Sequence, residues 1–125
     1  MAVSPSFLEF VLEQLEPLGE VSARRMFGGV GLYRGDLFFS VVDNDTVFFK
    51  VDDESVEAYK QAGMPPWRPF PDKPASDGYY QIPVTVLEDR DELARWAGRA
   101  VDVARSTRKA KAPGRRRNAK KRSSV

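Results

Sequence analysis

The chain has 125 residues, of which 42% are hydrophobic and 30% charged, proportions that are ordinary for one soluble globular domain. It contains no cysteine and no histidine, which excludes disulfides, thiol chemistry and zinc sites built on these residues and removes the commonest general base. No stretch approaches the roughly 18 apolar residues of a membrane span, and the N-terminus does not read as a secretory signal. We therefore expect a cytoplasmic protein with no membrane association, no metal site and no cofactor.

Charge is divided unevenly along the chain. Residues 1–104 hold ten Lys and Arg against all eighteen Asp and Glu, a net charge of −8, whereas residues 105–125 hold ten Lys and Arg and no acid. Residues 106–125 are also poor in apolar side chains, so they cannot bury enough surface to offset the entropy cost of ordering. We predict a folded domain over residues 1–105 and a disordered basic tail over residues 106–125.

The first half of the chain predicts one helix followed by a group of strands. Ser4 is a suitable N-cap with Pro5 at the first helical position, and apolar residues recur at helical spacing as far as Leu18. Segments rich in Val, Phe and Tyr then alternate with turn sequences containing Gly, Asn and Asp. These segments predict an antiparallel meander with strands over residues 21–27, 31–33, 37–42 and 47–51.

The second half predicts two more helices around a proline-rich stretch. A helix begins near Asp52 and stops at Gly63. Six of the nine prolines then fall in residues 63–83, where we expect short edge strands over residues 67–70 and 79–84. Aromatic side chains among these prolines form either a partner groove or, as we favour, an anchor to the core; they are Trp67, Phe70, Tyr79 and Tyr80. The closing helix starts at an Asp89 cap and carries an apolar stripe to residue 104.

This order of elements predicts a two-layer α+β fold with three helices on a mostly antiparallel sheet. The segments 37–39 and 47–49 place apolar residues on both faces of that sheet, which indicates that the second face is also covered, with a partner chain as one candidate. The corner at residues 28–31 is rich in glycine. It lacks the Lys-Ser/Thr of a phosphate-binding loop and precedes strand-like residues, so we interpret it as a turn.

The same corner lies in a distinctive run of residues, formed by Arg24, Arg25, Met26, Phe27, Gly28, Gly29, Val30, Gly31, Leu32 and Tyr33. Companion segments follow it at residues 37–39, 49–52 and 79–83. Over residues 5–105 the chain resembles the TfoX N-terminal domain family, also called the Sxy family. The resemblance implies an α+β fold similar to type III secretion chaperones and a link to regulators of natural competence and transcription. The basic tail stands where full-length regulators carry a second helical domain, which favours a stand-alone family member.

The tail offers a dense array of cations, which neutralise phosphates and release counterions without reading base sequence. We predict that it binds nucleic acid non-specifically; the alternative is a solubilising segment that screens the acidic domain. The candidate nucleic-acid-binding residues are Arg108, Lys109, Lys111, Arg115, Arg116, Arg117, Lys120, Lys121 and Arg122.

The residues and the resemblance together favour a non-catalytic regulatory or adaptor domain, because no two acids are placed in a way that supports an acid–base pair. Its expected partners are another protein, with the transcription machinery as the candidate, and nucleic acid bound through the tail. The alternative is a chaperone-like or structural homodimer that binds protein and has no nucleic-acid role.

Overall fold

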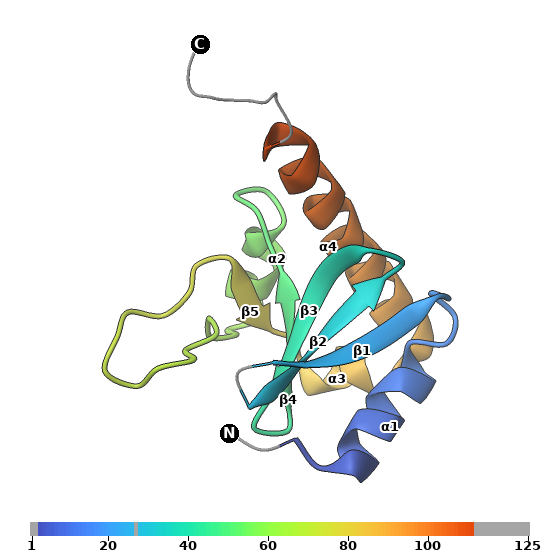
Figure 1. Ribbon diagram of the computed structural model, residues 1–125. Helices are drawn as coiled ribbons and strands as arrows, with labels where there is room; N and C mark the ends of the chain where they lie inside the picture. Colours follow the sequence, from blue (N-terminus) through green and yellow to red (C-terminus); the bar gives the residue numbers. More distant parts are fainter. Residues whose placement is uncertain (1–2, 27, 112–125) are drawn as a thin grey trace.

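The computed structural model describes residues 3–26 and 28–111 of the chain. Five strands form a single antiparallel sheet in the order β1-β2-β3-β4-β5, and helices pack on one of its faces (Figure 1). This arrangement confirms the predicted α+β fold and the meander. The elements, in chain order, are α1 (Pro5–Gln14), β1 (Val21–Met26), β2 (Gly29–Arg34), β3 (Leu37–Asp43), β4 (Thr46–Lys50), α2 (Val56–Gln61), β5 (Tyr79–Gln81), α3 (Val84–Leu87) and α4 (Arg90–Lys111).

The two longer helices begin where the sequence predicts caps. The Ser4 hydroxyl accepts a hydrogen bond from the backbone N–H of Phe7 at 3.3 Å, with Pro5 at the start of α1. The Asp89 carboxylate accepts hydrogen bonds from the N–H groups of Asp91 and Glu92, at 3.1 and 3.2 Å. Each cap satisfies donors that have no partner inside the helix, which fixes where the helix starts.

The core lies between the sheet and the helices. Phe39 of β3 and Phe49 of β4 are fully buried, with ring centroids 5.8 Å apart. The apolar stripe of α4 packs against β3 and β4 and supplies Leu93, Ala97, Ala100, Val101 and Ala104. Small alanines on this stripe let the long helix lie close to the aromatic rings of the sheet.

A buried polar contact joins three helices at one end of the core. The Gln14 amide of α1 donates a hydrogen bond to the carbonyl of Leu87 in α3 at 2.9 Å. Its oxygen accepts one from Nε of Arg90, at the start of α4, at 3.1 Å. Both the nitrogen and the oxygen of this buried amide are hydrogen-bonded. Any arrangement of the three helices that broke one of these bonds would leave a buried polar group without a partner, which costs free energy.

The proline-rich segment differs from its prediction. Only Tyr79–Gln81 forms a strand, while residues 67–70 are irregular and Pro66 makes an isolated bridge to Tyr80. Prolines lack the N–H that a sheet ladder needs, which explains the missing strand. The sequence also did not predict α3, a single turn that begins after Pro83.

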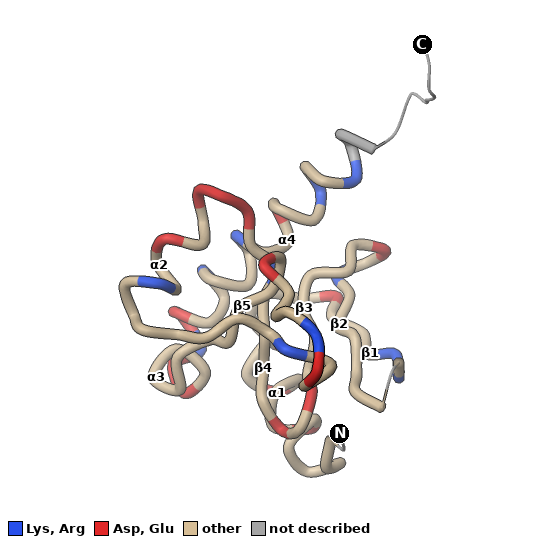
Figure 2. The backbone as a smooth tube through the Cα atoms, turned by 90° about the vertical axis from the view of Figure 1, so that its left-hand side faces the viewer, with Lys and Arg blue, Asp and Glu red and all other residues tan. Residues whose placement is uncertain are grey.

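The last helix continues past Arg105, where the sequence predicted the tail to begin, and reaches Lys111. Alanine, arginine and lysine favour helix, and cations at a helix C-terminus interact favourably with its dipole. The Arg108 guanidinium also contacts the Asp36 carboxylate of the β2–β3 turn at 2.7 Å, and its hydrogen bond and charge hold the pKa of Asp36 below its usual value. This end of α4 extends beyond the sheet (Figures 1 and 2).

None of the helices within residues 3–26 and 28–111 is both long enough and apolar enough to cross a bilayer.

Candidate partner-binding groove

A row of aromatic rings crosses the sheet face opposite the helices. Tyr33 stacks on Phe38 with ring centroids 5.1 Å apart, and Phe38 lies 5.9 Å from Tyr79. The Tyr79 ring meets Trp67 edge-on at 5.7 Å, and Trp67 in turn lies 6.2 Å from Phe48. The predicted cover on the second face is therefore partly supplied by the chain itself, because Trp67 comes from the proline-rich segment rather than from a partner.

Two cations lie against this aromatic row. The Arg24 guanidinium of β1 is 5.1 Å from the centroid of the Tyr33 ring, and the Lys50 ammonium of β4 is 5.0 Å from that of Tyr79. Such contacts stabilise a cation over the negative face of a ring. Burial raises the pKa of the Tyr79 hydroxyl to about 12.

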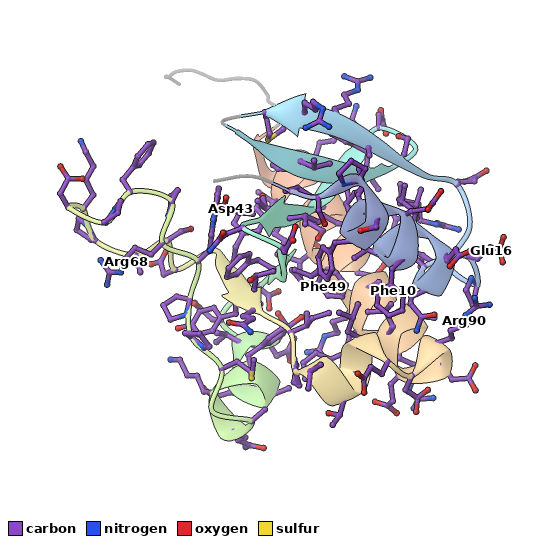
Figure 3. All side chains as sticks on the ribbon, turned by 90° about the horizontal axis from the view of Figure 1, so that it is seen from below. Phe10, Glu16, Asp43, Phe49, Arg68 and Arg90 are labelled. Atoms are coloured by element: carbon purple, nitrogen blue, oxygen red, sulfur yellow. The ribbon has the colours of Figure 1, made fainter. Side chains whose placement is uncertain are left out.

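The loop between α2 and β5 is held against the sheet by hydrogen bonds at its base. Trp67 donates from its backbone N–H to the Tyr79 carbonyl at 2.9 Å, and from its indole nitrogen to the Asp43 carboxylate at 3.1 Å. The backbone N–H of Ser76 closes the loop by donating a hydrogen bond to the Trp67 carbonyl at 2.7 Å. Figure 3 shows Asp43 at the end of the sheet next to this loop, and Arg68 within the loop.

A cavity of about 410 Å³ lies between this loop and the end of the sheet. Its walls come from the β1–β2 turn, from the end of β3, and from loop residues that include Trp67 and Phe70. The Phe70 side chain lines this cavity and is 53% exposed. The volume falls in the range of small-ligand and side-chain pockets, which are mostly apolar with a few polar groups. We call this site the Trp67 groove.

Two glycines in the first half of β2 permit the packing that shapes the Trp67 groove. A Cβ at Gly29 would lie 2.6 Å from the backbone carbonyl oxygen of Val42. A Cβ at Gly31 would lie 2.7 Å from the Met26 methyl group and 2.9 Å from the Phe38 ring. A side chain at Gly29 would clash with the backbone of the neighbouring strand β3, and one at Gly31 would clash with the side chains that lie over it.

We expect the substitution Gly29→Ala to lower the free energy of unfolding by about 1–3 kcal/mol, the usual cost of overpacking against groups that cannot move away. Thermal unfolding followed by circular dichroism measures the effect. Gly98→Ala is the control, because a Cβ at that position on α4 has no atom within 4 Å and alanine is the better helix former by about 1 kcal/mol. Equal stability of the two variants would contradict the close approach at Gly29.

The structure brings part of the predicted family run into the groove and leaves part outside it. Met26, Gly28 and Gly29 line the cavity. Gly31 lies under the aromatic row, and Arg24 contacts Tyr33 rather than a carboxylate. Gly28 has φ of 80° in the turn before β2. The turn is shorter than the predicted corner over residues 28–31, because residues 29–31 already belong to β2 and pair with β1. Arg25 is exposed on β1, and Phe27 lies outside the described residues.

The predicted nucleic-acid-binding residues are only partly described. Arg108 is exposed on α4 and paired with Asp36. Lys109 and Lys111 belong to the helix backbone, and the structure does not describe their side chains. The remaining predicted contacts lie outside the described residues: Arg115, Arg116, Arg117, Lys120, Lys121 and Arg122.

The groove also contains residues that sequence analysis did not single out. The sequence indicated only a turn at Asp43, yet its carboxylate accepts a hydrogen bond from the indole nitrogen of Trp67, 24 positions away. Val41, Pro69 and Pro71 line the cavity as well. No local sequence pattern predicts these contacts, because they join residues that are distant in the chain. Across residues 3–26 and 28–111, no three carboxylates gather closely enough to hold a metal ion. The side chains of Met26, Trp67 and Phe70 in the lining suit contact with apolar and aromatic groups.

The fold and groove define a small α+β domain with helices on one face of an antiparallel sheet and an aromatic, loop-covered groove on the other. Residues 13–104 match the TfoX N-terminal domain, and the chain belongs to that family. The predicted family is therefore confirmed, whereas the similarity to secretion chaperones stays a prediction. No curated protein matches the chain in sequence.

Proposed function

We propose that the protein is a non-catalytic regulatory or adaptor domain of the cytoplasm that holds a protein partner in the Trp67 groove and binds nucleic acid non-specifically through its basic C-terminal segment. The observation that carries the proposal is the placement of the family run. Its residues Met26, Gly28 and Gly29 line the same cavity as the exposed ring of Phe70. The most characteristic part of the sequence thus builds a binding surface.

The composition of the groove supports a protein partner. Interface centres are enriched in aromatic residues and methionine and depleted in charge, and the groove offers Trp67, Phe70 and Met26 around its cavity. Prolines on either side of Phe70 restrict the backbone, which lowers the entropy lost when a partner binds. A component of the transcription machinery is the candidate partner that follows from the family.

The charge distribution supports the nucleic-acid part of the proposal. The body of the protein is acidic over residues 1–104, and the basic residues are concentrated at its C-terminal end. The last turns of α4 extend beyond the sheet (Figure 1), so the basic segment continues from a part of the helix that the rest of the body leaves uncovered. Separation of the two charges allows a phosphate backbone to approach the cations without strong repulsion.

The test is an affinity pull-down from the native cytosol, with and without nuclease, of the wild-type chain and Phe70→Asp. We expect a partner protein that persists after nuclease treatment and binds the variant about 30-fold more weakly, as for the loss of a central aromatic contact. Val84→Asp is the matched control, since Val84 is 62% exposed and belongs to α3 rather than to the groove. Equal capture by all three chains would contradict the groove as the binding site.

A homodimer joined along β1 is the second candidate. β1 is an edge strand of the sheet, and its four central residues are exposed, so another strand has room to pair with it. Arg24 and Arg25 lie in that strand, and charged residues on an edge oppose pairing with a like-charged copy. The adaptor function is therefore favoured over self-association.

A further inference from the structure

A second depression, which shares no lining residue with the Trp67 groove, lies between α4 and the end of β2. Its volume is about 470 Å³, and arginine supplies most of its charged lining. We call it the α4 groove and define it by Arg34, Arg95, Gly98, Arg99, Asp102 and Arg105. Four guanidinium groups face one carboxylate there, although the body of the protein as a whole is acidic.

The arginines of the α4 groove differ in how far they are already engaged. Arg105 pairs with Asp102 at 2.9 Å, and Arg95 pairs with Glu92 one turn earlier. Both pairs are exposed, and exposed pairs contribute about 1 kcal/mol or less. These two cations can therefore exchange a carboxylate for a phosphate at little cost.

The other two arginines keep donors available. Arg34 uses Nε to donate to the carbonyls of Leu18 and Gly19, at 3.3 and 3.2 Å. This anchoring fixes the guanidinium, while its two terminal nitrogens have no partner in the described part of the chain. Arg99 is exposed, and its guanidinium makes no hydrogen bond or ion pair with another described residue. Backbone hydrogen bonds lower the pKa of the Asp52 carboxylate, and the charge of Arg99 contributes to the same shift. A guanidinium held in place in advance binds a phosphate oxygen with less entropy loss.

The floor of the groove is open between these side chains. Gly98 lies between Arg95 and Arg99 on α4, and a Cβ there would meet nothing within 4 Å. Nothing on the helix therefore prevents a ligand backbone from approaching it. Glycine costs about 1 kcal/mol in a helix relative to alanine, so its presence here is not explained by stability.

The α4 groove also continues into the basic end of the chain. The helix rises about 1.5 Å per residue, so Lys111 lies about 18 Å beyond Arg99 along the axis. That distance corresponds to roughly five base pairs of duplex DNA, at about 3.4 Å each. Figure 2 shows further basic residues along this part of α4, and six more Lys and Arg follow among residues 112–125.

We propose that the α4 groove binds the phosphate backbone of the same nucleic acid that the C-terminal cations hold, so that the interface begins on the folded domain at Arg34 and Arg99. This inference rests on the proposed nucleic-acid function and adds a defined site to it. Backbone contacts of this kind set the position and orientation of the protein on the nucleic acid and leave base sequence unread.

The test measures binding of the full chain to a random-sequence duplex by fluorescence anisotropy between 50 and 200 mM salt. Arg99→Gln is expected to weaken binding about fivefold at 50 mM salt and to reduce the slope of log K against log salt by about one. Gly98→Glu, which places a negative charge on the open floor, is expected to weaken binding at least as much. Gly98→Gln separates the charge from the added bulk and should bind like wild type.

Lys73→Gln is the matched control for the loss of one positive charge, because Lys73 is exposed in the α2–β5 loop. If Arg99→Gln and Gly98→Glu bind no more weakly than Lys73→Gln, the α4 groove is not part of the interface, while the tail assignment stands. If the wild-type chain itself does not bind the duplex, the proposed nucleic-acid function fails, and the groove proposal fails with it.

Discussion

A chain cut after Lys111 is expected to lose most of its affinity for nucleic acid while keeping its fold. The removed segment carries six cations: Arg115, Arg116, Arg117, Lys120, Lys121 and Arg122. Each phosphate contact on duplex DNA contributes about 0.9 to the slope of log K against log salt, so the cut should reduce that slope by about five. The ratio of the full chain's affinity to the shortened chain's affinity should therefore be about a thousandfold larger at 50 mM salt than at 200 mM salt.

The position of this cut follows from the structure. The sequence placed the start of the tail at residue 106, but α4 continues to Lys111, and Arg108 contacts Asp36 of the β2–β3 turn. A cut after Arg105 would remove that contact and shorten the helix. A loss of nucleic-acid binding could then come from a less stable fold rather than from the missing cations.

Duplex binding measured over 50–200 mM salt, together with thermal unfolding of both chains, tests this expectation. The shortened chain should unfold at the same temperature as the full chain, and any binding that remains should come from α4. A shortened chain that binds as tightly as the full chain would show that the C-terminal cations are not the nucleic-acid-binding residues.

Phe49→Ala is expected to give the largest loss of stability of any single change considered, about 3–5 kcal/mol. Phe49 is fully buried, and its ring packs against Phe39. It belongs to β4, an interior strand paired with β3 and β5, and lies between the sheet and the helices (Figure 3). Removing the ring leaves a cavity that the surrounding strands can fill only partly. Chemical denaturation with urea or guanidinium measures the change through the midpoint at constant slope.

Phe10→Ala is the matched control, because it removes the same ring from a side chain of α1 that is 38% exposed. We expect a change of about 0.5 kcal/mol or less there, as for most surface positions. If Phe49→Ala were as stable as Phe10→Ala, the core described between β4 and α4 would be wrong.

The two predicted effects separate the two parts of the protein. Phe49 stabilises the body without touching either groove, whereas residues 112–125 are expected to act on binding without contributing to the core. The Trp67 groove and the α4 groove have no lining residue in common, and where both involve β2 they use its opposite ends, Gly29 and Arg34. The proposed protein partner and the proposed nucleic acid would therefore occupy separate sites, as the proposed adaptor function requires.

The sequence by itself determined the features that depend on neighbouring residues. The Ser4 and Asp89 caps, the meander and the apolar stripe of α4 follow from helical spacing, strand alternation and local turn chemistry, and the structure has all of them. The family run around Gly28 and Gly29 was equally visible, because its residues are consecutive.

Only the tertiary structure decided what those residues build. Trp67 meets Asp43 across 24 positions, and Arg34 meets α4 only because the β2–β3 turn packs beside that helix. Such contacts depend on how the chain folds back on itself, and no local spacing encodes them. For the same reason the sequence predicted the tail to begin at residue 106, since the Asp36 contact that supports the final turns of α4 comes from a distant part of the chain.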